Sequence, residues 1–150
     1  MKLDPHALAR AAGEAMYEKD NASRGLGMTL EEIGPGYARM SMKVREDMVN
    51  GHHICHGGLI FTLADSTFAF ACNSHNHVAV AQGANIEFLA PGKLGDMLTA
   101  IGEERHSAGK TGVYDIRVSN QDGRTIALFR GKSFRIGGHL VEPPAQEENP

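Results

Sequence analysis

The sequence lacks several features that would define a class of protein. Its 150 residues include no tryptophan and only two cysteines, which are too few for a disulfide framework. No apolar run approaches the roughly 20 residues that cross a bilayer. The amino terminus has neither the charged start nor the apolar segment of a secretory signal. We therefore expect a cytoplasmic protein that does not enter a membrane.

Strong charge is also missing. The formal net charge is −3 and no basic run is present, so nucleic acid is not an expected partner. An apolar fraction of 41% and a charged fraction of 22% are typical of a globular chain, and the length suits one domain with its own core. We expect this domain over residues 1–140. A disordered tail is predicted over 141–150, where prolines and acidic residues gather.

The pattern of apolar residues predicts a helix, two strands, one long helix and four more strands. The first helix covers about residues 4–20, and the long helix covers 56–73. The strands are expected at 28–33, 37–45, 78–89, 96–105, 111–120 and 124–136. Because short turns join consecutive strands, we expect an antiparallel sheet in an α+β domain. An antiparallel sheet wrapped around one long apolar helix is the hotdog fold.

One short stretch carries most of the chemistry. Gly57 and Gly58 begin the long predicted helix, and Asp65 lies inside it among apolar residues such as Leu63 and Phe68. The free N–H groups and positive dipole end of a helix start can stabilise a developing oxyanion. A carboxylate buried among apolar side chains is costly unless it is paired or used. Together the two features indicate acyl transfer.

The spacing of these groups has a consequence for assembly. Gly57 and Asp65 are eight positions apart, which places them roughly 12 Å apart along one helix. A reacting carbonyl needs its oxyanion donor and its nucleophile or base within about 3 Å each. One helix cannot supply both groups to one substrate, whereas a two-fold partner can. If both groups act, the site lies at a dimer interface.

Further motifs extend over nearly the whole chain. They are Asn50-Gly51, Cys55-His56-Gly57-Gly58, Ala64-Asp65, Phe88-Leu89-Ala90-Pro91-Gly92, Thr111-Gly112-Val113-Tyr114-Asp115 and Phe129-Arg130-Gly131-Lys132-Ser133. In this order, over about residues 16–138, they closely resemble the hotdog-fold thioesterases of the phenylacetate-degradation type (PaaI). A lone His-Gly-Gly is a weak signal. Its combination with Asp65 and the strand motifs is specific.

The resemblance implies roles for four residues. The N–H of Gly57 would bind the thioester carbonyl, and Asp65 would attack the carbonyl or activate a water. Asn50 would hold or orient the water or the carboxylate of the partner subunit. His56 would shape the loop or polarise the carbonyl. The sequence does not choose between the nucleophile and general-base roles of Asp65.

The resemblance also implies a substrate and an assembly. The expected activity is an acyl-coenzyme A thioesterase for aryl-acetyl groups, such as phenylacetyl or a hydroxylated form, with no cofactor. Gly58, at the helix start, is an expected substrate-binding residue. Lys110 and Arg135 are expected to bind the substrate too, because the negative charges of coenzyme A need a cationic surface. We expect a homo-oligomer. A dimer follows from the site, and a tetramer built as a dimer of dimers follows from the resemblance alone.

Plainer roles remain open for the same residues. Asn50 can form an ordinary Asn-Gly turn, and His56 can be a satisfied histidine at a helix start. Gly57 and Gly58 can serve a turn or close helix packing. Asp65 can be a buried acid that caps or bridges a neighbouring group.

Other functions are also open. Clustered histidines and cysteines invite a zinc site, but their spacing matches no usual zinc pattern and no metal is expected; they are His52, His53, Cys55, His56, Cys72, His75 and His77. A hotdog dehydratase resembles a pattern with a histidine in a proline-containing loop, and no proline lies near His56. A non-catalytic sensor of acyl-coenzyme A would normally carry an extra domain, for which this chain has no room.

Overall fold

The structure, a computed structural model, describes residues 4–143. Its helices and strands are α1 (Pro5–Lys19), α2 (Asn21–Gly25), β1 (Thr29–Gly34), β2 (Tyr37–Lys43), the 3-10 helix η1 (Glu46–Met48), α3 (Gly57–Asn73), β3 (Ala79–Phe88), β4 (Met97–Ala108), β5 (Thr111–Ser119) and β6 (Thr125–Arg135). Every predicted helix and strand is present, and two short helices, α2 and η1, are additional. Helices of five and three residues are too short to show a periodic apolar pattern.

Asp20 explains why the helical region continues beyond α1. Its backbone N–H donates to Tyr17 O at the end of α1, and its carboxylate accepts hydrogen bonds from the N–H and hydroxyl of Ser23 at 3.0 and 2.6 Å. One residue therefore caps the end of α1 and the start of α2. The Ser23 hydroxyl also contacts Ser66 of α3 at 2.8 Å. This contact ties the amino-terminal helices to the long central helix.

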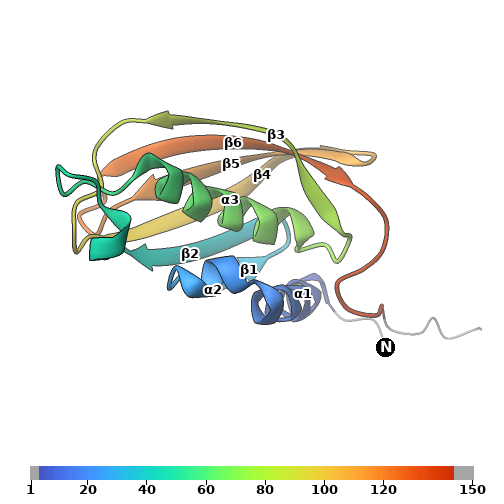
Figure 1. Ribbon diagram of the computed structural model, residues 1–150. Coiled ribbons are helices and arrows are strands. Elements are labelled where there is room, and N and C mark those ends of the chain that lie inside the picture. Colours follow the sequence, from blue (N-terminus) through green and yellow to red (C-terminus); the bar gives the residue numbers. More distant parts are fainter. Residues whose placement is uncertain (1–3, 144–150) are drawn as a thin grey trace, which may run out of the picture.

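The six strands form one antiparallel sheet in the order β1-β2-β4-β5-β6-β3. The chain leaves the sheet after β2, forms α3, and returns as β3 at the opposite edge, beside β6. Helix α3 lies across one face of the sheet, and α1 and α2 lie beside it near β1 and β2 (Figure 1). The predicted α+β class and hotdog arrangement are confirmed.

The core forms between α3 and the inner face of the sheet. In β2 the side chains of Ala38, Met40 and Met42 are fully buried, as the alternating pattern of that strand predicts. In α3 the ring of Phe68 lies against Gly131 of β6, where a Cβ atom would come within 2.8 Å of three ring atoms. Glycine is therefore required at 131, because it allows the helix to lie directly on the strand.

Not all of this apolar surface is covered within one protomer. The sequence predicts burial of the long helix on all sides, but Asp65 and Ala69 are only half-buried. Strand β3 is an edge strand with mostly exposed residues, including Val80 at 46% and Phe88 at 52%. Exposed apolar residues on an edge strand are typical of a surface that pairs with another chain.

The carboxy-terminal segment is fastened to the loop after α3. Asn76, in the left-handed region with φ of 64°, accepts hydrogen bonds from the N–H groups of Leu140 and Val141 and donates one to Val141 O. Of the predicted disordered tail, Val141 is thus held in place, and residues 144–150 lie outside the described part. Within residues 4–143 no helix is long and apolar enough to cross a membrane. The cytoplasmic location stays a prediction.

Candidate active site

The start of α3 has one N–H group that no residue in the described part of the chain accepts from. His56 is the N-cap, and its Nδ1 accepts a hydrogen bond from the Gly58 N–H at 3.1 Å. The N–H groups of Leu59 and Ile60 donate to the His56 carbonyl at 2.9 and 3.3 Å. Among residues 4–143, no acceptor pairs with the N–H of Gly57. Gly57 is therefore the helix-start donor that remains available to a substrate carbonyl.

The same hydrogen bond constrains the tautomer of the His56 ring. A ring nitrogen that accepts from a backbone N–H must carry a lone pair, so Nδ1 is unprotonated and the proton of the neutral ring lies on Nε2. The structure thus gives His56 the capping role, and its Nε2 has no hydrogen-bond partner among residues 4–143. It also shows that the N–H of Gly58, a residue predicted to bind substrate, is already bonded to His56.

Neighbouring segments hold the approach to α3 in place. The His56 N–H donates to Met48 O at 2.8 Å, and the Cys55 N–H donates to Gly92 O at 2.7 Å. Isolated bridges pair Val49 with Cys55 and residue 54 with residue 93. The start of the helix is thereby hydrogen-bonded to two segments, one at the end of η1 and one in the turn before β4. This rigidity suits a donor that must be oriented before the reaction begins.

Asn50 combines a structural role with a free amide group. Its Oδ1 accepts hydrogen bonds from the N–H groups of His52 and Ile54 at 2.9 and 3.3 Å, which shapes the loop before α3. This is the turn that the plainer interpretation of Asn50 predicts. The Nδ2 group donates to no acceptor in the described chain. An exposed donor is therefore left to reach a group outside the protomer.

Asp65 lies in the middle of α3 without a compensating partner. Burial raises the pKa of its carboxyl group, and no hydrogen bond within residues 4–143 offsets this effect. Phe61 and Phe68 lie one turn before and after it, on the same side of the helix. Because α3 is one continuous helix from Gly57 to Asn73, the rise per residue separates Asp65 from the Gly57 N–H by about 12 Å along the helix axis. One protomer therefore holds both groups but does not bring them together.

The two cysteines are poor nucleophiles. Burial raises the pKa of Cys55 to about 11 and that of Cys72 to about 12. A thiol is far less reactive than a thiolate, so at neutral pH both cysteines are protonated packing residues. In the part of the chain that the structure describes, no three histidine, cysteine or acidic side chains are grouped so as to hold a metal ion.

The predicted cations lie at the other end of the helix. The Arg135 N–H donates to Lys110 O at 2.8 Å, so these two residues are neighbours. Arg135 pairs with Ala79, at the start of β3, whereas Phe88, at the end of β3, lies against Gly57. Lys110 and Arg135 are thus far from Gly57 within one protomer. They could serve a site at Gly57 only from a partner subunit.

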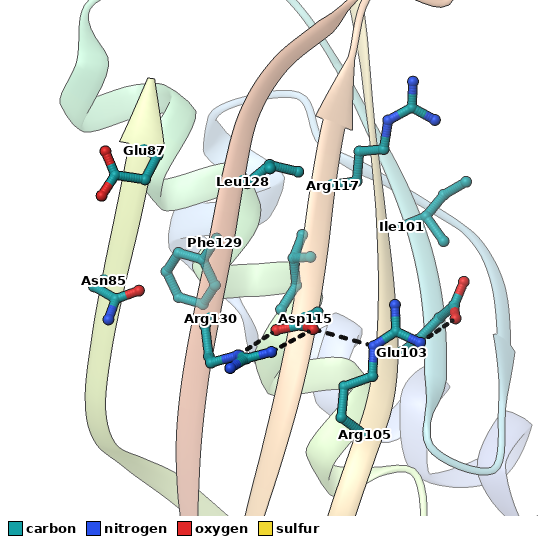
Figure 2. A pocket seen from close by; sticks show the side chains of 11 residues that line it. Asn85, Glu87, Ile101, Glu103, Arg105, Asp115, Arg117, Leu128, Phe129 and Arg130 are labelled. Atoms are coloured by element: carbon teal, nitrogen blue, oxygen red, sulfur yellow. Dashed lines mark hydrogen bonds and ion pairs between the residues drawn. The ribbon is translucent and has the colours of Figure 1, made fainter. Parts of the chain in front are cut away.

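A cavity of about 570 Å³ opens on the outer face of the sheet, the face opposite α3. Asp115 lines this cavity and lies between two arginines (Figure 2). It accepts hydrogen bonds from Arg130 at 2.6 and 2.9 Å and from Arg105 at 3.1 Å. The bonds from Arg130, despite some burial, lower the pKa of Asp115. This cavity contains none of the predicted catalytic residues. Its arginines are already paired, which argues against a role in catalysis.

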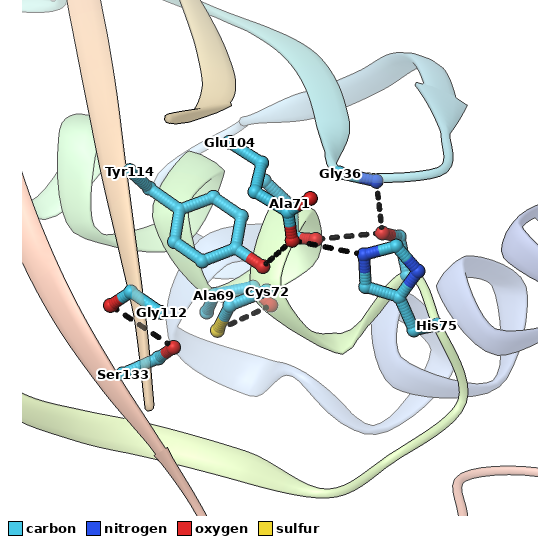
Figure 3. Close-up of polar contacts among 10 residues, drawn as sticks. Gly36, Ala69, Ala71, Cys72, His75, Glu104, Gly112, Tyr114 and Ser133 are labelled. Atoms are coloured by element: carbon cyan, nitrogen blue, oxygen red, sulfur yellow. Dashed lines mark hydrogen bonds and ion pairs between the residues drawn. The ribbon is translucent and has the colours of Figure 1, made fainter. Parts of the chain in front are cut away.

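A second polar cluster, which the sequence did not reveal, closes the carboxy-terminal end of α3. Glu104 Oε1 accepts a hydrogen bond from the Tyr114 hydroxyl at 2.7 Å and lies 3.1 Å from His75 Nε2 (Figure 3). These residues come from β4, β5 and the turn after α3. The spacing along the chain does not predict this cluster, because the register between β4 and β5 places Glu104 opposite Tyr114.

Comparisons with known proteins show the family to which the chain belongs. A model of the thioesterase superfamily matches residues 52–127. The acyl-coenzyme A thioesterase PaaI of Escherichia coli K12 is 52% identical over 127 residues, covering 85% of this chain and 91% of that protein. The solved E. coli PaaI structure, from the phenylacetic acid degradation operon, matches with a TM-score of 0.89 and 48% identity, covering 91% and 99% of the two chains. A hypothetical thioesterase from Streptococcus pneumoniae, solved with coenzyme A, matches at 0.72 and 30%, covering 75% and 90%.

The chain therefore belongs to the thioesterase superfamily and is a thioester hydrolase with the hotdog fold. Within that superfamily it is of the PaaI type, the acyl-coenzyme A thioesterases that the E. coli relative represents. The predictions of family and enzyme class are confirmed. The roles of the individual site residues stay predictions.

Proposed function

We propose that the protein hydrolyses aryl-acetyl-coenzyme A thioesters to the free acid and coenzyme A, at a site shared by two protomers. One observation carries the shared site: the unused Gly57 N–H and the unpaired Asp65 carboxylate lie on the same helix, too far apart to meet. Relatives solved with coenzyme A and with acetyl-coenzyme A support a coenzyme A ester as the substrate. The aryl-acetyl group is the expectation drawn from the PaaI resemblance.

The chemistry follows from the two groups. The Gly57 N–H donates a hydrogen bond to the thioester oxygen and stabilises the negative charge that forms there. Asp65 of the partner subunit either attacks the carbonyl carbon, giving an anhydride that water cleaves, or removes a proton from an attacking water. Both routes expel the thiolate of coenzyme A, which is a good leaving group. Burial that raises the pKa of Asp65 also makes its carboxylate a stronger base.

The remaining predicted residues act around this centre. The free Asn50 amide donates to the attacking water or to the carboxylate of the partner subunit, and His56 Nε2–H lies beside the oxyanion site. Lys110 and Arg135 of the partner subunit bind the phosphates of coenzyme A. The exposed apolar face of β3 supports an edge-to-edge dimer, and a tetramer would form from two such dimers.

The first test is free-thiol release from a panel of acyl-coenzyme A esters. Fast release from phenylacetyl-type esters, abolished in Asp65→Asn, is the expected result. If ligands bind tightly but no ester is cleaved, the protein is an acyl-coenzyme A sensor and Asp65 is a structural acid. The dehydratase alternative predicts hydration of an unsaturated acyl ester with no thiol release.

The shared site is tested by combining two inactive variants. Gly57 is the first residue of α3, where the helix tolerates proline. Proline there removes the N–H and adds ring atoms, including a Cβ that meets the Phe88 ring at 3.2 Å. His56 has φ −58° and ψ 131°, which suits a residue before proline. We expect Gly57→Pro to lower kcat by about 100-fold or more. Gly57→Ala keeps the N–H and is the matched control, with a smaller loss.

Co-expression of Gly57→Pro with Asp65→Asn should then restore activity. Each mixed dimer regains one intact site from the two chains, so about a quarter of the wild-type activity should return. Gly57→Pro co-expressed with the double variant Gly57→Pro/Asp65→Asn is the control, because no site in that mixture has the N–H. Absence of restoration in the first mixture, with dimers formed, would show that each chain builds its own site.

A further inference from the structure

Phe88 occupies the space directly beside the proposed oxyanion donor. A Cβ atom built on Gly57 would lie 3.2 Å from Phe88 Cζ and 3.4 and 3.7 Å from the two Cε atoms. The outer end of the ring therefore points at Gly57. The side chain is nonetheless 52% exposed, so packing within the protomer uses only part of its surface.

The backbone fixes the ring in this place. Phe88 is the last residue of β3 and pairs with Ala127 of β6. Directly after it, the N–H groups of Leu89 and Ala90 both donate to Ile126 O, at 2.8 and 3.2 Å. An aromatic ring carried on such an anchored backbone has little freedom to move away. Its position beside Gly57 is set by the sheet rather than by a flexible loop.

The position of the ring relates it to the substrate. An oxygen bound by the Gly57 N–H lies about 3 Å from that nitrogen, and the first atoms of the acyl group follow within two bonds of the oxygen. From its place beside Gly57, the ring can reach the acyl group near its carbonyl. It has no hydrogen-bonding group, so it offers nothing to the amides of the coenzyme A arm. An apolar acyl group gains from burying the exposed part of the ring.

We propose that Phe88 is a specificity-determining residue whose ring packs against the acyl group and favours aryl-acetyl over short acyl chains. In an aryl-acetyl ester the aromatic ring is one methylene from the carbonyl, which places it in reach of Phe88. Aromatic pairs gain stability beyond the area they bury, and an acetyl group cannot make that contact. The inference rests on the proposed function, since it concerns the same site.

The test measures kcat and KM for phenylacetyl- and acetyl-coenzyme A in Phe88→Ala and Phe88→Tyr. We expect Phe88→Ala to lower the ratio of kcat/KM for the two esters about five- to tenfold, and Phe88→Tyr to restore it. Leu89→Ala is the matched control, because it removes a neighbouring apolar side chain that is 55% exposed. Its ratio should stay within about twofold of the wild type.

The outcomes separate this inference from the proposed function. If the wild-type protein cleaves neither ester, the proposed function fails and the inference fails with it. If the wild type is active but Phe88→Ala lowers kcat/KM equally for both esters, or leaves the ratio unchanged, only the inference fails. Circular dichroism and gel filtration of Phe88→Ala confirm that the variant is folded and assembled before its kinetics are compared.

A double variant tests the contact itself. The Cβ of Gly57→Ala is too close to the Phe88 ring, and Phe88→Ala removes that ring. We expect acetyl-coenzyme A turnover of Gly57→Ala/Phe88→Ala to exceed that of Gly57→Ala by about threefold or more, because neighbouring changes are not additive. An equal loss with and without the ring would show that Phe88 does not pack at Gly57.

Discussion

The two ends of α3 treat their polar groups in opposite ways. At the carboxy-terminal end, the Asn73 amide bonds to three backbone groups, and the Ser74 hydroxyl donates to one carbonyl and accepts from another segment. Glu104, packed beside this end, has two partners. The Gly57 N–H, at the amino-terminal end, and the Asp65 carboxylate, in the middle of the helix, have no partner among the described residues. A polar group that is held rigidly and has no protein partner can form its hydrogen bond with a substrate instead.

The contrast is sharpest between the two carboxylates, Asp65 and Glu104. Burial raises the pKa of Asp65, and no neighbour reverses the effect. Burial would also raise the pKa of Glu104, but the hydrogen bonds from Tyr114 and His75 outweigh it and lower the pKa. The pKa values of the two acids thus shift in opposite directions, because only Glu104 accepts hydrogen bonds from its neighbours. We therefore expect the paired acid to stabilise the fold and the unpaired acid to act in the reaction.

The largest expected effect comes from neutralising each carboxylate in turn. Asp65→Asn should lower kcat by about 100-fold or more, since it removes the base or nucleophile. Glu104→Gln, the matched change at the paired acid, should leave kcat within about twofold. Steady-state kinetics with phenylacetyl-coenzyme A measures both. A large loss of kcat in a folded Glu104→Gln protein would contradict the division between a catalytic and a structural acid.

A smaller effect is expected from the hydroxyl that holds Glu104. Tyr114→Phe removes one hydrogen bond but keeps the ring against Phe68, at a centroid distance of 5.7 Å. The free energy of unfolding should fall by about 1 kcal/mol, as urea denaturation would show. Tyr37→Phe is the control, because the Tyr37 hydroxyl makes no hydrogen bond within residues 4–143. Equal destabilisation by the two changes would mean that the bond to Glu104 contributes nothing.

The smallest effect is on the pH dependence of stability. In the folded state the pKa of Asp65 is raised above its ordinary value of 3.8. At pH values just above 3.8, Asp65 therefore carries a proton more often in the folded protein than in the unfolded chain. The free energy of unfolding therefore falls as the pH rises from about 3.8 through the raised pKa, and it stays lower at neutral pH. Asp65→Asn should unfold at higher urea than the wild type near pH 7, and the difference should shrink toward pH 4. A variant less stable than the wild type at pH 7 would assign Asp65 a structural partner.

Much of the fold was predictable because local patterns carry it. The alternation in β2 matches the buried face of the strand, and the apolar run from 57 to 73 matches α3. The helix-start glycine and the lone acid were visible for the same reason, since each is defined by its immediate neighbours. The short α2 was not predicted, because one helical turn capped by Asp20 leaves no periodic signal.

Other parts of the site required the three-dimensional structure. The sequence determined that a carboxylate lies on an apolar helix eight residues after a glycine, and simple helix geometry then separated the two by about 12 Å. Only the tertiary structure decided that Phe88 meets Gly57, and that Glu104 is paired while Asp65 is not. Those outcomes depend on contacts between strands and helices distant in the chain, and local sequence does not encode such contacts.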